Sequence, residues 1–107
     1  MDRTGQYRDA VKRIVQHYAQ FQPSHGDIRL DAVCDDQTGR YTLVHAGWNL
    51  RKRVHGMVLY VRVEDGKVVV EYDGVSEGVY ADLIESGIPG EDIVLAYRHE
   101  QPATATA

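Results

Sequence analysis

The chain has 107 residues, of which 43% are hydrophobic and 26% are charged, and its formal net charge is −4. These values are typical of an ordinary globular domain and exclude a disordered chain. The acidic balance also argues against a protein that binds nucleic acid by itself, because basic surfaces supply most of the affinity for nucleic acid. It does not exclude a local basic patch. We expect one domain over residues 1–98 and a mobile tail over residues 99–107.

Neither a membrane span nor an export signal is expected. No apolar run approaches the roughly 18 residues that a span needs, and the first ten residues have no apolar core of the signal-peptide type. The chain has a single cysteine, Cys34, which cannot form an internal disulfide and fits a reducing compartment. The sequence therefore favours a cytoplasmic protein with Cys34 as a small buried hydrophobe.

The first expected element is an amphipathic helix from Tyr7 to Phe21. Its apolar residues recur at helical spacing, while basic and polar residues fill most of the other positions. The apolar positions are Tyr7, Val11, Ile14, Val15, Tyr18 and Phe21. We expect the helix to end before Pro23 and residues 24–27 to form a connecting turn.

A first hairpin is expected next. The alternation of apolar and polar residues begins near Ile28, and residues 36–39 form a turn signal. Pairing Arg40 with Asp35 sets the register and places His45 on the more apolar face of the sheet. The same register makes three further pairs: Tyr41 with Cys34, Leu43 with Ala32, and His45 with Leu30.

A second hairpin is indicated by Asp65-Gly66, a two-residue turn signal whose positions both tolerate positive φ. Residues 48–53 interrupt the alternation, so we expect its first strand to begin at Val54 or His55. One face then pairs Glu64 with Lys67, Arg62 with Val69 and Tyr60 with Glu71. The other face, which is apolar, pairs Val63 with Val68, Val61 with Val70 and Leu59 with Tyr72.

The end of the domain predicts a second helix and a short strand. The helix spans Glu77–Ser86 and stops at Gly87, with Val79 and Leu83 inward and Tyr80 and Ile84 as further inward candidates. Residues 89–92 form a short turn, and residues 93–97 are an apolar run suited to an edge or docking strand. The fold class is α+β in the order α-β-β-β-β-α-β: an antiparallel meander of about four strands plus a short C-terminal strand, with both helices on one face.

Two surfaces are candidates for contact with a partner. Arg51, Lys52 and Arg53 lie beside Trp48, and a tryptophan among cations suits base stacking or a protein anchor. The same charges also fit a solvated loop that prevents edge-to-edge pairing, which is the interpretation we favour. A second candidate is an apolar stripe on the outer face of the hairpin, formed by Val58, Tyr60 and Val69.

Catalytic and metal-binding interpretations find little support. His45 and His55 flank an inter-strand loop, and no His-x-x-x-His or Cys-x-x-Cys pair is present. An acidic group of Glu71, Asp73 and Glu77 suits a cation or a base, but a turn signal and a helix start explain it as well. A small metal-dependent hydrolase using His45, His55 and Asp73 remains an alternative from a different class.

With these segments in view, the chain resembles the XisI family, the fdxN element excision controlling factors. The resemblance spans roughly residues 7–97. It is carried by PSHGDI at 23–28, HAGWN at 45–49, RVHG at 53–56, DGK at 65–67, YDG at 72–74, GIP at 87–89 and EDIVL at 91–95. Gly90 departs from the family pattern, in which lysine is usual, and residues 98–107 lack the longer basic and aromatic tail of the family.

The resemblance implies a small α+β protein with an accessory role in programmed excision of a DNA element. It implies a protein partner, the nuclease-like companion XisH, and it transfers no catalytic residue, cofactor or metal. Our leading hypothesis is a non-enzymatic controlling factor that binds an XisH-like protein and forms a homodimer through part of its sheet, contacting nucleic acid only indirectly or weakly. Direct DNA binding through Trp48 and residues 51–53 is the alternative, and it predicts affinity that falls steeply with salt.

Overall fold

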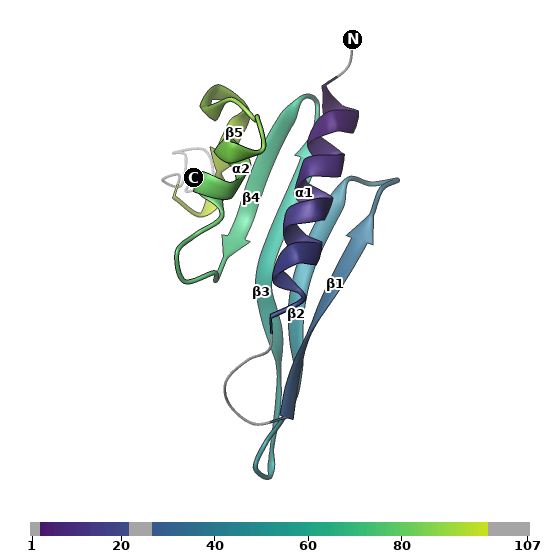
Figure 1. The fold of residues 1–107 in the computed structure, drawn as a ribbon, viewed down its shortest axis with the longest axis vertical. Coiled ribbons are helices and arrows are strands. Elements are labelled where there is room, and N and C mark those ends of the chain that lie inside the picture. Colours follow the sequence, from purple (N-terminus) through teal and green to yellow (C-terminus); the bar gives the residue numbers. More distant parts are fainter. Residues whose placement is uncertain (1–2, 22–26, 99–107) are drawn as a thin grey trace, which may run out of the picture.

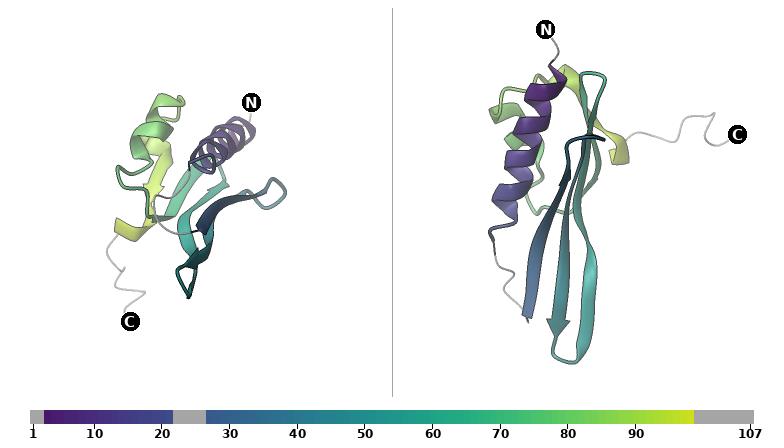
Figure 2. Two further views of the ribbon diagram at one scale, coloured as in Figure 1. Left: turned by 60° about the horizontal axis from the view of Figure 1, so that its bottom comes forward. Right: turned by 90° about the vertical axis from the view of Figure 1, so that its right-hand side faces the viewer.

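The structure, a computed structural model, describes residues 3–21 and 27–98. A mixed five-stranded sheet has the strand order β1-β2-β3-β4-β5. Two α-helices, α1 and α2, lie on the same side of this sheet (Figures 1 and 2). The elements follow the expected order, and their bounds are α1 Thr4–Tyr18, β1 Asp27–Asp35, β2 Arg40–Asn49, β3 Lys52–Glu64, β4 Lys67–Asp73, α2 Tyr80–Glu85, η1 Gly90–Asp92, β5 Ile93–Leu95 and η2 Ala96–Arg98.

Helix α1 packs the predicted apolar stripe against the sheet, with Tyr7, Val11 and Val15 buried. The helix begins and ends about one turn earlier than the sequence predicts. After Tyr18 the hydrogen bonding changes to the pattern of a 3₁₀-helix, since the amides of Gln20 and Phe21 donate to the carbonyls three residues before them. Phe21 therefore leaves the stripe and is 54% exposed. The predicted turn after Pro23 lies outside the described residues.

The β1–β2 hairpin has the predicted register. Asp35 pairs with Arg40, and Leu30 pairs with His45. Its turn contains Gly39, whose φ is +70° and whose carbonyl accepts the amide of Val63 at 2.8 Å. A Cβ at this position would lie 2.3 Å from the Val63 carbonyl oxygen, so the turn packs against the end of β3 as only glycine allows.

The β2–β3 hairpin is longer than the sequence predicts. Instead of an interruption at residues 48–53, both strands continue until only Leu50 and Arg51 remain in the turn. Leu50 adopts a φ of 60°, a conformation for which two-residue turns usually carry glycine, asparagine or aspartate, so the sequence gives no turn signal at this position. A bulge between Leu43 and Val44 shifts the pairing, and Val58 packs against the core instead of the outer face.

The β3–β4 hairpin turns as predicted at Asp65 and Gly66, both at positive φ. Its register is confirmed from the turn as far as Val61 and Val70. Beyond that point a bulge adds one residue to β4, so Tyr60 pairs with Tyr72 and Leu59 with Asp73. The predicted pairs of Tyr60 with Glu71 and Leu59 with Tyr72 are wrong, because residue counting assumes an unbroken ladder.

Helix α2 is shorter than predicted because the Asp73 carboxylate organises the preceding loop. One oxygen accepts the amide of Val75 at 3.0 Å, and the other accepts that of Val79 at 2.9 Å. Val79 and Leu83 are buried as predicted, whereas Tyr80 and Ile84 are 44% and 40% exposed and are not core residues. The helix stops at the predicted Gly87, where the amides of residues 87 and 88 bond back to residues 84 and 83.

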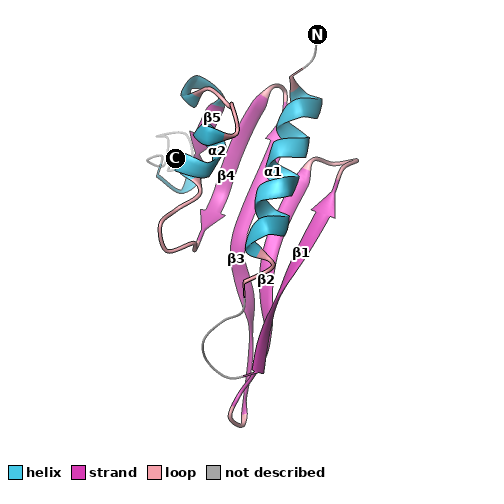
Figure 3. Cartoon of the chain, viewed as in Figure 1, coloured by secondary structure: helices cyan, strands magenta, loops and turns pink. Residues whose placement is uncertain are grey.

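The last strand, β5, pairs parallel with β4 at the edge of the sheet. It is shorter than the predicted apolar run, since Ala96 begins the short helix η2. Figure 3 shows that α2 connects β4 to β5, as the crossover between parallel strands requires. The predicted tail at residues 99–107 lies outside the described residues.

The core lies between the two helices and the inner face of the sheet. Its fully buried side chains come from every layer, and they include Val11 and Val15 of α1, Tyr41, Leu43, Leu59, Val61, Val63, Val68 and Val70 of the strands, and Val79, Leu83 and Ile88 around α2. Neither α1 nor α2 covers the other face of the sheet (Figure 2). The fold thus buries one sheet face and leaves the other open.

Candidate functional site

The open face of the sheet carries an apolar area, which we call the outer face. The register places the following residues there: Val33, Thr42, Val44, Ala46, Met57, Tyr60, Val69 and Tyr72. Val33, Met57 and Tyr72 are 55%, 43% and 48% exposed. Arg62 borders the area and is paired with Glu64 at 2.9 Å and Glu71 at 2.7 Å. Apolar area bordered by ion pairs is typical of a contact surface.

The predicted stripe of Val58, Tyr60 and Val69 is therefore only partly correct. Tyr60 and Val69 lie on the outer face, but the bulge in β3 moves Val58 to the core and puts Met57 in its place. Val33 follows the period-two pattern of β1 and was available from alternation alone. Met57 and Tyr72 depend on the two bulges, which no sequence pattern here marks.

The second candidate surface is the hairpin tip, defined as residues Trp48–Arg53. Figure 1 shows it projecting beyond the end of α1 at the foot of the molecule. Leu50 at the turn is 92% exposed and Trp48 is 48% exposed. Arg51, Lys52 and Arg53 are also exposed. The structure thus gathers the predicted basic residues and Trp48 on one projection, and it adds Leu50, which sequence analysis missed.

Within the tip, Trp48 and Arg53 form a cross-strand pair on the outer-face side. The guanidinium carbon of Arg53 lies 5.4 Å from the centroid of the Trp48 ring, and its Nη1 donates to the Gly47 carbonyl at 3.4 Å. Such a stacked cation holds the indole in place. The tip therefore combines an ordered aromatic surface with one exposed leucine and a local excess of positive charge.

The residues of the hydrolase alternative do not converge. His45 pairs with Gly56, and Ala46 pairs with His55, so the two histidines lie on opposite faces of the sheet. His45 covers Gly56, where a Cβ would lie 2.7 Å from its Nε2. Asp73 is engaged with the amides of Val75 and Val79. No group of three metal-binding side chains occurs within residues 3–21 and 27–98.

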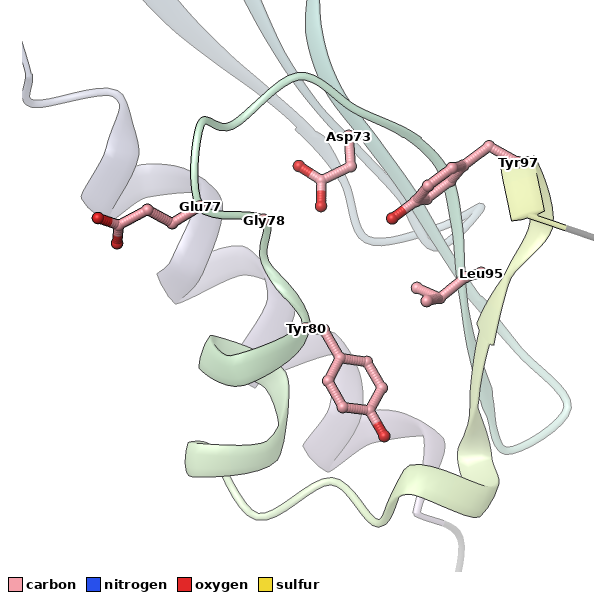
Figure 4. Close-up of a pocket in the computed structure, with 6 residues that line it drawn as sticks. All are labelled: Asp73, Glu77, Gly78, Tyr80, Leu95 and Tyr97. Atoms are coloured by element: carbon pink, nitrogen blue, oxygen red, sulfur yellow. The ribbon is translucent and has the colours of Figure 1, made fainter.

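The acidic group predicted around residue 73 is divided among separate roles. Glu71 is paired with Arg62 on the outer face, whereas Asp73 and Glu77 line a pocket of about 460 Å³ on the helix side. The rest of the pocket wall is Gly78, Tyr80, Leu95 and Tyr97 (Figure 4). Tyr80 and Tyr97 are not predicted as site residues, because the packing of α2 and the parallel docking of β5, which bring them to the end of β4, leave no local sequence pattern.

Among the described residues, three tyrosine–carboxylate pairs join α1 to η1, α1 to α2, and β2 to the β1–β2 turn. Tyr7 donates to Asp92, Tyr18 donates to Asp82 at 2.5 Å and Tyr41 donates to Asp36 at 2.7 Å. The hydrogen bond from Tyr7 holds the pKa of Asp92 below its ordinary value. The bond to Asp82, with burial and neighbouring carboxylates, raises the pKa of Tyr18 to about 12. These groups stabilise the fold and face no shared reaction centre.

These observations define the class of protein: a small α+β domain whose helices cover one face of a mixed sheet and whose open face and hairpin tip are suited to contacts. The XisI protein family matches residues 1–107, and the chain belongs to this family. No helix in the described ranges has the length and apolar content needed to cross a lipid bilayer.

Two solved structures from Anabaena variabilis ATCC 29413 are similar to this chain over nearly their whole length. One is the fdxN element excision controlling factor XisI, with 27% identity, a TM-score of 0.78, and coverage of 96% of this chain and 98% of the other. The second is a XisI-like protein, with 25% identity, a TM-score of 0.81, and coverage of 90% and 88%. No curated protein matches the chain.

Proposed function

We propose that this protein is a non-enzymatic controlling factor for excision of a DNA element and that it acts in the cytoplasm by binding an XisH-like protein. Membership of the XisI family supports the role in excision, as does the likeness to a protein described as an excision controlling factor. The acidic balance of the chain, at a net charge of −4, favours a protein partner over DNA as the main ligand.

The hairpin tip is the observation that carries this proposal. A half-exposed tryptophan held by an arginine is typical of residues that dominate protein interfaces, and the exposed Leu50 adds apolar area beside it. The tip stands clear of α1, so a partner can enclose it from several sides (Figure 1). The outer face is the surface through which we propose that two copies form a homodimer.

Co-purification tests the proposal. The tagged chain is expressed together with an XisH-like protein, and we expect the two to elute together. The double variant Trp48→Ala/Leu50→Ala removes both anchors and should weaken retention at least about tenfold. Phe21→Ala is the matched control, because Phe21 is a similarly exposed aromatic residue outside the tip. A wild-type chain that never retains the XisH-like protein would contradict the proposal.

Direct DNA binding is the second candidate, favoured by the three cations and the exposed indole of the tip. Direct binding predicts that the logarithm of the DNA-binding constant falls linearly with the logarithm of the salt concentration, with a slope of about −3 for three neutralised phosphates. The triple variant Arg51→Gln/Lys52→Gln/Arg53→Gln should give a shallower slope. A fluorescence anisotropy titration of duplex DNA across a range of salt concentrations separates the two candidates. A flat salt dependence would exclude direct binding.

A further inference from the structure

The pocket beside β5 lies on the helix side of the sheet, away from both surfaces discussed above. Its wall comes from four parts of the chain: the end of β4, the loop before α2, the first turn of α2, and the β5–η2 segment. In Figure 4 the Asp73 carboxylate and the Tyr97 hydroxyl face the same hollow, and the Glu77 carboxylate points away from it. The hollow thus has one inward carboxylate.

That carboxylate is fixed in place before any ligand arrives. Each of its oxygens accepts one backbone amide, from Val75 at 3.0 Å and from Val79 at 2.9 Å. A carboxylate can accept about four hydrogen bonds, so Asp73 retains capacity for a donor that enters the pocket. Because the loop already holds the Asp73 carboxylate in one orientation, a ligand loses little free energy in ordering it, and this favours binding of a hydrogen-bond donor.

The surroundings of Asp73 are negative and aromatic. No lysine, arginine or histidine is among the six residues of the pocket wall, and Glu77 adds a second carboxylate at its rim. The negative potential of this region also acts on Tyr18. The hydrogen bond to Asp82 and burial raise the pKa of Tyr18 to about 12, and the charges of Asp82, Glu77 and Asp73 contribute to this shift. Tyr80 and Tyr97 are 44% and 49% exposed, so both can offer ring surface to a ligand.

These properties select one class of ligand. A carboxylate excludes anions, and a single inward carboxylate without other ligating side chains is a poor site for a divalent metal ion. Aromatic rings beside a carboxylate attract an organic cation through the ring quadrupole and the charge together. Leu95 supplies an apolar wall for an alkyl stem.

We propose that this pocket binds the side chain of an arginine or lysine presented by a partner polypeptide. The guanidinium or ammonium group donates to Asp73, and the alkyl stem lies against Leu95 between the rings of Tyr80 and Tyr97. This inference extends the proposed partner-binding role, and rests on it for the source of the side chain. It assigns the partner a chemical feature, an accessible basic residue, which the hairpin tip does not require.

A nuclear magnetic resonance titration tests the pocket without the partner. The labelled chain is titrated with N-acetyl-arginine methylamide, and the amide signals of Gly78, Leu95 and Tyr97 are expected to shift saturably. N-acetyl-citrulline methylamide has nearly the same shape without the charge and should leave these signals in place. Equal shifts with both compounds, or none with the arginine compound, would overturn the proposal.

Variants at Tyr97 separate a binding role from a structural one. Tyr97→Ala removes a ring and should weaken the arginine compound about two- to fivefold, whereas Tyr97→Phe keeps the ring and should bind nearly as the wild type does. Equal affinity of Tyr97→Ala and the wild type for the arginine compound would contradict the proposed contact with the Tyr97 ring. If the chain binds the arginine compound but retains no XisH-like protein, the proposed function is wrong and the pocket assignment stands. If the chain retains the XisH-like protein but does not bind the arginine compound, only the pocket assignment is wrong.

Discussion

At the scale of single residues, the most consequential side chain is Asp92, which is 8% exposed and joins three distant parts of the chain. It accepts from Tyr7 of α1, and its two oxygens lie 3.4 Å from Arg3 and 3.2 Å from Lys67. Asp36 plays a similar part beside Lys12 and Tyr41. Charged carboxylates therefore fasten α1 and η1 to the sheet.

This arrangement predicts loss of stability in acid. The hydrogen bond from Tyr7 lowers the pKa of folded Asp92, and the bond from Lys12 lowers that of Asp36. Their contribution is complete above the unfolded value of about 3.9 and is lost as the pH falls through the lower folded values. We expect the free energy of unfolding, measured by urea denaturation and circular dichroism, to decline below about pH 4.

The variant Asp92→Asn isolates one of these groups. It should be less stable than the wild type at pH 7, and the difference should shrink as the pH falls below the unfolded value of about 3.9, because protonation of the wild-type carboxylate removes the contribution that the variant already lacks. Asp9→Asn serves as the control, since Asp9 is an exposed carboxylate of α1. A constant difference between Asp92→Asn and wild type across this pH range would contradict the assignment.

At the scale of elements, the sequence specifies the hairpins well and the bulges poorly. Asp65-Gly66 determines the register of β3 and β4 from the turn to Val61, since both residues accept the required φ. Past that point the extra residue in β4 shifts the pairs, and the alternation of apolar residues cannot signal it. The same limit explains why Val58 was expected on the outer face and Met57 was not.

Helix α2 shows a different limit. Its apolar residues fit two possible inward stripes, and only the packing against the sheet decides between them. Leu83 is 1% exposed and Ile84 is 40% exposed. The pocket was likewise invisible in the sequence, because it needs β5 to dock in parallel beside β4, bringing Leu95 and Tyr97 toward Asp73. Long-range docking of this kind leaves no local pattern.

A pair of neighbouring substitutions tests this assignment of faces. Leu83→Ala should reduce the free energy of unfolding by about 2–5 kcal/mol, because it leaves a cavity under α2. Ile84→Ala removes as many atoms from a side chain that is 40% exposed and should cost less than about 1.5 kcal/mol. Chemical denaturation of both variants measures the difference. Equal losses would show that the helix is rotated from the orientation described here.

At the scale of the whole molecule, the fold divides its surface into regions of different character. The helix side carries the pocket and its carboxylates, the outer face is apolar, and the hairpin tip is basic and projects from one end (Figures 1 and 4). Such a division allows a small domain to meet more than one partner at once without competition between them. It also explains how a chain with a net charge of −4 can keep a basic surface.

The outer face predicts the state of association. If two copies meet through this face, the wild type should have twice the mass of one chain by light scattering after gel filtration. Tyr72→Glu places a charge at a residue that is 48% exposed, and it should yield single chains without loss of folding. Leu50→Glu, at the tip, is the control and should leave the mass unchanged. A wild type that is monomeric at all concentrations would contradict the homodimer.

The shortest strand also has a consequence for the order in which the molecule opens. β5 has three residues and is separated from its partner β4 in the chain by α2, so we expect its contacts to close late in folding and to open early. Leu95 and Tyr97 belong to this segment, and the pocket is lost whenever it detaches. A cationic side chain bound in the pocket would therefore stabilise the docking of β5 against β4, and the amide protons of β5 would exchange more slowly with solvent in its presence.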